Sequence, residues 1–114
     1  MTDKTDKQLQ KHVDNIADEL SGKDDSWFDY GESDHDMPNP HDYMSDALDI
    51  EYIVSSRHEY LGARILVAFG GPNIWINTRN NTVEGYWWGS EAFAHFDDDL
   101  GINDYITELY ECTR

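Results

Sequence analysis

Residues 61–88, LGARILVAFGGPNIWINTRNNTVEGYWW, decide the fold of this chain. The first nine residues form a nearly continuous apolar run, which is typical of a central strand. The next segment alternates two isoleucines with Trp75, and residues 83–88 add another strand-like segment. The residues between these segments include glycine, proline and asparagine, which favour tight turns. The stretch therefore predicts three strands joined by short turns.

A further strand precedes this stretch. Residues 49–55, DIEYIVS, begin with alternating polar and apolar side chains, and the polar residues 55–59 separate them from the central strand. Four strands joined by short turns most simply form an antiparallel meander.

The N-terminal residues 5–20 predict a helix with one narrow apolar stripe that ends near Gly22. The stripe consists of Leu9, Val13, Ile16 and Leu20. Lysines near the start and aspartates near the end oppose the helix dipole, so the helix should be marginal alone. We expect it to pack on the domain or on another chain, where the stripe would form a homodimer interface.

Residues 101–112 predict a C-terminal helix. Ile102, Ile106 and Leu109 form its buried side, and its acidic residues fall on the opposite side. Asp98 or Asp99 is the expected N-cap, because a carboxylate suits that end of the helix dipole.

These elements predict an α+β fold in which helices pack on one face of a four-stranded antiparallel sheet. We divide the chain into an N-terminal amphipathic helix (residues 1–23), an acidic loop or arm that contains aromatic residues (24–48) and a compact ββββα domain (49–114).

The charge of the chain is strongly acidic. Its 114 residues suit a single domain, and their formal net charge is −16. This charge argues against direct binding to nucleic acid or an anionic membrane, because both favour Lys and Arg. The single cysteine excludes a disulfide framework within one chain. Without an apolar run long enough to span a membrane, we expect a cytoplasmic protein.

The acidic residues are unevenly distributed. Residues 24–49 contain nine carboxylates and no Lys or Arg, whereas residues 60–83 contain no carboxylate and two arginines. The acids return from Glu84 onward and include the triplet at residues 97–99. The chain therefore has an acidic arm, a neutral-to-basic middle and an acidic tail.

The candidate catalytic and metal-binding motifs are incomplete. His35 and His41 are flanked by carboxylates and would suit a metal-dependent enzyme, but a solvated acidic loop is favoured. Residues 97–108 approach a calcium loop, with the required glycine one position early, and are explained as well by a capped helix start. Cys112 has no neighbouring histidine or lysine that would lower its pKa. We predict no catalytic residue, no metal and no cofactor.

The strands are rich in aromatic residues. Trp87 and Trp88 are adjacent, so in a strand they would point to opposite faces, and at least one would lie under a helix or on the open face. Core packing and an exposed anchor for a partner remain equal alternatives.

The uneven distribution of the acidic residues favours a surface that presents carboxylates in place of nucleic-acid phosphates. Solubility or adaptation to high salt would also explain this distribution. Nucleic-acid sites are lined with Lys and Arg, and a rigid array of carboxylates suits such a site. The candidate contacts are Asp24, Asp25, Asp29, Asp34, Asp36, Asp97, Asp98, Asp99, Asp104, Glu108 and Glu111, with Trp27 and Phe28 as anchors.

The segments GGPNIWINTR (70–79) and VEGYWWG (83–89) resemble a small family of uncharacterised proteins from phages and other mobile elements. The resemblance covers residues 48–112 and implies no functional residue. By size and charge, the chain is similar to the class of antirestriction and anti-CRISPR inhibitors, several of which are DNA mimics.

We therefore expect a non-enzymatic inhibitor of a host nucleic-acid-binding defence protein, either a CRISPR effector or a restriction enzyme. The alternative is a protein-interaction adaptor, or a dimerising structural module of a phage, in which the acid only maintains solubility.

Overall fold

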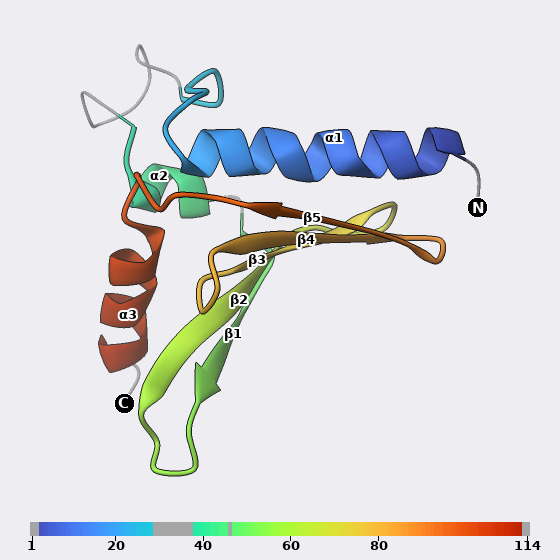
Figure 1. The fold of residues 1–114 in the computed structure, drawn as a ribbon. Helices are drawn as coiled ribbons and strands as arrows, with labels where there is room; N and C mark the ends of the chain where they lie inside the picture. The colour runs from blue at the N-terminus through green and yellow to red at the C-terminus, as the bar shows by residue number, and fades with distance from the viewer. Residues whose placement is uncertain (1–2, 29–37, 46, 113–114) are drawn as a thin grey trace.

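The computed structural model describes residues 3–28, 38–45 and 47–112 (Figure 1). The elements are α1 Asp3–Leu20, α2 Pro40–Met44, β1 Asp49–Val54, β2 Tyr60–Ala68, β3 Asn73–Asn77, β4 Thr82–Trp87, β5 Ser90–His95 and α3 Ile102–Cys112. Four residues singled out from the sequence lie outside this described part, namely Asp29, Asp34, His35 and Asp36.

The strands form one antiparallel sheet in the order β1-β2-β3-β4-β5. The predicted α+β class and antiparallel sheet are confirmed, but the predicted count of four strands is wrong because the sheet has five. The missed strand, β5, has the sequence SEAFAH, which is poor in β-branched residues. It is held by pairing with β4 along all six of its residues.

A two-residue turn joins β4 to β5. Its residues, Trp88 and Gly89, have φ values of 51° and 82°. Two residues with positive φ match the twist of a hairpin, but a bulky side chain such as that of Trp88 is strained in this conformation. The prediction that Trp87 and Trp88 point to opposite faces of a strand is wrong, because β4 ends at Trp87 and Trp88 lies in the turn.

Helix α1 lies over β4 and β5 (Figure 1). Leu9, Val13 and Leu20 are fully buried there, and Ile16 packs against the same core. The apolar stripe therefore packs on the chain's own sheet. This overturns the predicted homodimer interface through these residues, because the core of a single chain already covers them.

Close packing at Gly85 fixes the position of α1 on the sheet. A Cβ on Gly85 would lie 2.7 Å from Val13 Cγ1 and 2.9 Å from Leu9 Cδ1. Real side chains do not approach this closely, so the helix reaches the strand only because the residue is glycine.

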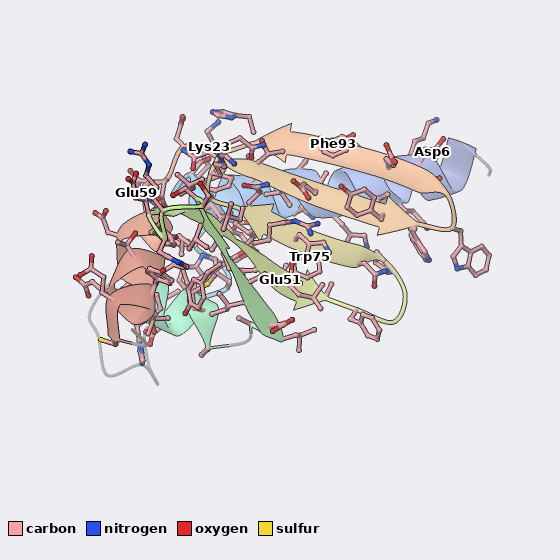
Figure 2. The ribbon with its side chains drawn as sticks, turned by 90° about the horizontal axis from the view of Figure 1, so that it is seen from below. Asp6, Lys23, Glu51, Glu59, Trp75 and Phe93 are labelled. Carbon is pink, nitrogen blue, oxygen red and sulfur yellow. The ribbon has the colours of Figure 1, made fainter. Side chains whose placement is uncertain are left out.

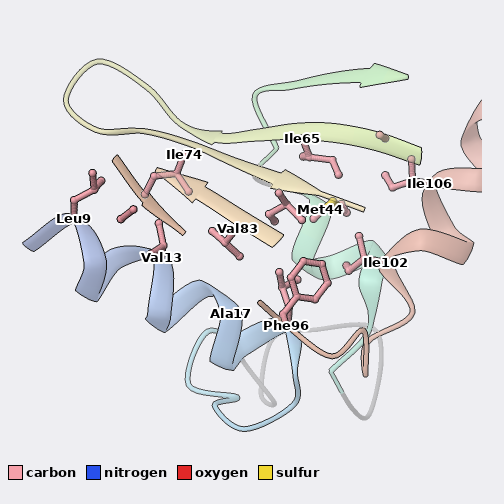
Figure 3. Packing of buried hydrophobic residues seen from close by; sticks show 14 residues of the cluster. Leu9, Val13, Ala17, Met44, Ile65, Ile74, Val83, Phe96, Ile102 and Ile106 are labelled. Carbon is pink, nitrogen blue, oxygen red and sulfur yellow. The ribbon is translucent and has the colours of Figure 1, made fainter. Parts of the chain in front are cut away.

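Helix α3 packs against β2 and extends the core (Figure 3). Ile102 and Ile106 are fully buried in the same cluster as Ile65 and Phe96, and Leu109 packs against it. The predicted buried side of this helix is confirmed.

The predicted loop between residues 24 and 48 contains the short helix α2. Asn39 caps this helix by accepting a hydrogen bond from Asp42 N to its Oδ1 at 2.9 Å, and Pro40 takes the first helical position. The prolines that suggested a loop thus include one that begins a helix, where proline is favoured. Met44 is buried and joins the helix to the core.

Gly85→Ala should destabilise the protein by about 1–3 kcal/mol, because the added Cβ overpacks the contact with α1. Urea unfolding followed by circular dichroism measures the change in the free energy of unfolding. Gly71→Ala is the matched control and should change stability by less than about 1 kcal/mol, because a Cβ there meets no atom within 4 Å. Equal effects of the two substitutions would contradict the proposed close contact.

Candidate functional site

The end of α1 meets the turn that precedes α3, and this contact brings the two acidic stretches together. Asp97 N donates to Ser21 Oγ at 3.0 Å, and Asp99 N donates to Leu20 O at 3.2 Å. Gly22 lies against the Asp99 carboxylate, which would have to move to admit a Cβ, and its φ of 77° also favours glycine. We call the carboxylates gathered here the acidic end, which consists of Glu19, Asp24, Asp25, Asp97, Asp98 and Asp99.

Four of these carboxylates line a hollow of about 360 Å³. They belong to Glu19, Asp24, Asp25 and Asp99, and the remaining walls include Trp27, Pro38 and Leu100. Residues from the start of the arm and from the tail therefore share one surface.

Two carboxylates of the acidic end have shifted pKa values. A hydrogen bond from Ser26 N to Asp24 Oδ1 at 2.9 Å lowers the pKa of Asp24. Burial raises the pKa of Glu19, and the negative charge of Asp24 adds to the rise, while the hydrogen bond donated by Tyr43 OH at 2.7 Å opposes it. Negative charges therefore lie close together at this site, and the raised pKa of Glu19 reflects part of the free-energy cost of ionising it there.

The side chain of Asp98 reaches the start of helix α3 at Ile102. Its two carboxylate oxygens accept hydrogen bonds from Ile102 N at 2.7 Å and from Asn103 N at 2.9 Å. The predicted N-cap position at Asp98 or Asp99 is wrong, because Gly101 directly precedes the helix and its O accepts from Tyr105 N at 3.1 Å. The carboxylate of Asp98 nevertheless caps the first amides from three residues further back. Because Ile102–Cys112 is helical, the segment that resembled a calcium loop is a capped helix start.

The outer side of α3 carries the remaining candidate carboxylates, Asp104, Glu108 and Glu111, all of which are exposed. Helix α3 stands at the side of the molecule below the acidic end (Figure 1). In the described part of the chain, none of these three residues, nor Asp97 or Asp99, lies within ion-pair distance of a lysine or arginine.

The aromatic candidates hold the chain after α1 in place. Trp27 is half-buried and packs edge-to-face on Tyr43, with ring centroids 4.8 Å apart, and on Phe28, at 5.6 Å. Phe28 is only 7% exposed, so its ring is not available on the surface as the predicted anchor. Both rings instead support the segment that carries Asp24 and Asp25.

His41 Nδ1 lies 3.0 Å from Tyr105 OH, in a contact between α2 and α3. No group of three or more potential metal ligands is present among the residues that the structure describes.

The sheet face opposite the helices carries a polar network that the sequence analysis missed. Figure 2 views this open face, with Trp75, Phe93 and Glu51 labelled on it. Arg64 lies at the centre, with Nη2 3.1 Å from Glu84 Oε1, Nη1 3.7 Å from Glu51 Oε1 and its guanidinium 4.3 Å from the ring centroid of Trp75. The sheet register brings these residues together, because Arg64 pairs with Glu51 and Trp75 pairs with Glu84, and no local pattern of the sequence specifies that register.

Glu84 is the anchor of this network. Its side chain is only 12% exposed and also accepts hydrogen bonds from Asn77 Nδ2 at 3.0 Å and from Tyr86 OH at 3.4 Å. Its carboxylate is thus satisfied by three side chains, which fixes the arrangement of the open face.

Two aromatic side chains are exposed at the turns of neighbouring hairpins. Phe69 is 74% exposed beside the β2–β3 turn, and Trp88 is 79% exposed in the β4–β5 turn. The pairing of Asn73 with Tyr86 brings these two turns to the same end of the sheet.

Comparison with protein-family models, curated protein sequences and solved structures finds no match to this chain. The resemblance to mobile-element proteins therefore stays a prediction. None of the described helices combines the length and apolar character needed to cross a membrane.

Glu19→Gln should stabilise the protein at neutral pH by less than about 1 kcal/mol, because partial exposure screens the charge that is removed. A raised pKa means that folding favours protonated Glu19. Its favourable contribution is therefore present below the ordinary value of 4.5 and is lost as the pH rises through the folded pKa. The amide still accepts from Tyr43, so the advantage of the variant should vanish below pH 4.5. Unfolding by urea at both pH values tests this, and a variant less stable at neutral pH would contradict it.

Arg64→Met should destabilise the protein by about 1–3 kcal/mol, because Glu84 is nearly buried and would lose its cation. Glu51→Gln is the control and should stay within about 0.5 kcal/mol, because Glu51 is exposed and 3.7 Å from Arg64. Thermal unfolding compares them. Adding Glu84→Gln to Arg64→Met should recover part of the loss, and failure to do so would contradict the role of charge.

Proposed function

We propose that this chain is a non-enzymatic acidic inhibitor of a host nucleic-acid-binding defence protein, either a CRISPR effector or a restriction enzyme. It would bind in the basic groove of that protein, with its carboxylates in the places of nucleic-acid phosphates. The cell of a bacterial host is the compartment that this proposal requires.

The observation that carries the proposal is the convergence of two acidic stretches at the acidic end. Asp24 and Asp97 are far apart in sequence, yet the contact between Ser21 and Asp97 brings their segments together. A chain that needed acid only for solubility would gain nothing from gathering it on one surface, because dispersed charge serves solubility equally well.

Pre-organisation also supports the proposal. Ser26 N holds the Asp24 carboxylate, and the first amides of α3 hold that of Asp98. Carboxylates fixed before binding lose less side-chain entropy when the complex forms. The exposed carboxylates of α3 would extend the array along a rigid helix.

The test is the affinity of the full chain for purified Cas effector–guide complexes and restriction endonucleases, measured by calorimetry at several salt concentrations. Binding should weaken steeply with salt, and duplex DNA should compete with the chain for the same site. An affinity independent of salt, or no binding to any member of the panel, would contradict the proposal.

Matched charge variants locate the contact. Asp97→Asn, Asp99→Asn and Glu108→Gln together should weaken binding about tenfold or more and reduce its salt dependence. The control combines Asp14→Asn, Glu59→Gln and Glu91→Gln, which remove the same number of exposed charges elsewhere and should change affinity by less than about threefold. Asp98 is left intact because it caps α3. Equal losses would show that only total charge matters.

The second candidate function is a protein-interaction adaptor. The exposed rings of Phe69 and Trp88 favour it, because exposed aromatic residues are common in binding hot spots. An adaptor of this kind would bind with little dependence on salt and would lose its partner when both rings are replaced by serine.

A further inference from the structure

The two edge strands of the sheet, β5 and β1, differ in what covers their outer sides. At the outer edge of β5, Gln10 of α1 donates from Nε2 to Phe93 O at 3.1 Å, and Ser90 Oγ donates to Asp6. Strand β1 forms the opposite edge. Among the residues that the structure describes, no helix or strand runs along the outer edge of β1 (Figure 1).

In β1, the backbone N–H and C=O groups of every second residue point away from β2. Ala63 of β2 accepts a hydrogen bond from Thr78 N at 2.9 Å, and its own N–H donates to Thr78 Oγ1 at 2.9 Å, so its polar groups face β3. Tyr52 pairs with Ala63, and in an antiparallel sheet its N–H and C=O then point away from β2.

The N–H of Ile50 also points away from β2, since it donates to the Asp49 carboxylate at 2.9 Å and not to β2. The irregularity in the pairing lies on β2, where Leu61 is the extra residue, so β1 keeps its alternation. The residues of β1 whose backbone N–H and C=O groups point away from β2 are therefore Ile50, Tyr52 and Val54.

We propose that β1 pairs antiparallel with β1 of a second copy of this chain, about a two-fold axis at Tyr52. The two sheets then form one continuous sheet, and the outward N–H and C=O groups of both strands pair with each other, with the Val54 carbonyl of the second copy replacing the Asp49 carboxylate at Ile50 N. In this register Ile50 lies opposite Val54 of the second copy, and Glu51 lies opposite Ile53. Every carboxylate thus faces a neutral residue.

Pairing about a two-fold axis at either residue next to Tyr52 is less favourable. An axis at Glu51 would place two carboxylates directly opposite each other, which is unfavourable. An axis at Ile53 would extend the pairing into residues 55–58, where His58 N bonds to Ser55 O and the chain already turns. Only the axis at Tyr52 uses the whole ordered strand.

The local charge permits this pairing in a very acidic chain. Residues 49–83, which include all of β1, contain three arginines and three carboxylates, whereas the whole chain has a net charge of −16. The edge also exposes apolar side chains, since Leu48 is 59% and Val54 is 40% exposed. Strand β1 itself carries Asp49 and Glu51, and Arg64 of β2 lies 3.7 Å from Glu51. A second copy therefore meets a partly apolar edge whose surroundings are neutral as a whole, so like-charge repulsion is weaker there than at the acidic end.

The first test is sedimentation of the full chain over a range of concentrations, in which we expect a monomer–dimer equilibrium. Val54→Pro should weaken the dimer at least about tenfold. It removes an outward N–H, and proline is tolerated at such edge positions. Trp88→Ser is the control, because it removes a highly exposed side chain from the β4–β5 turn, at the other side of the sheet from β1, and should leave the dimer unchanged.

The second test is specific to the register and does not depend on the proline variant folding. Ile53→Lys creates two pairs with Glu51 across the axis and should tighten the dimer, whereas Ile53→Glu creates two repulsions and should weaken it. Each change should be about two- to thirty-fold in Kd.

A wild-type chain that stays monomeric at its highest soluble concentration would overturn the proposal, even if β1 bound a strand of another protein. A dimer insensitive to all β1 variants, or lost with Trp88→Ser, would also overturn it. The proposed function is independent of these outcomes, since it is tested by salt-dependent binding to the nuclease panel.

Discussion

The structure depends above all on the contact between α1 and the sheet at Gly85. The apolar stripe of α1 has no other place to be buried, and the glycine lets Leu9 and Val13 rest directly on the strand. From that contact follow the position of the helix end at Ser21, the meeting of that end with Asp97, and the gathering of the carboxylates. An apolar contact at the middle of α1 thus determines where the charge lies.

Much of this fold was predictable from the sequence, because strong periodicity marks α1, α3 and four of the strands. Strand β5 was not, since its alanines fit a strand only when β4 is already beside them, and its turn begins with Trp88 in a conformation that bulky residues avoid. The candidate carboxylates were identified by local composition alone. That Phe28 is buried, and that Arg64 organises the open face, depends on contacts between distant segments that no local pattern reveals.

The distribution of charge separates two kinds of surface. The acidic end and the outer side of α3 are solvated and carry like charges, which resist self-association and suit a basic partner. The β1 edge and the open face are neutral or internally paired, with Arg64 balanced by Glu84. Binding to an oppositely charged protein and pairing with a second copy would therefore use different regions and would not compete.

The long-range contacts of α1 also constrain how the chain folds as it is synthesised. The helix leaves the ribosome before the sheet, yet the backbone oxygen that Gln10 contacts belongs to Phe93, 83 positions later. Until β4 and β5 have emerged, the stripe of α1 has no sheet to cover it, and a helix whose charges oppose its dipole is marginal in water. Strands β4 and β5 must therefore leave the ribosome before α1 is secured, so the helix and the sheet fold together and late.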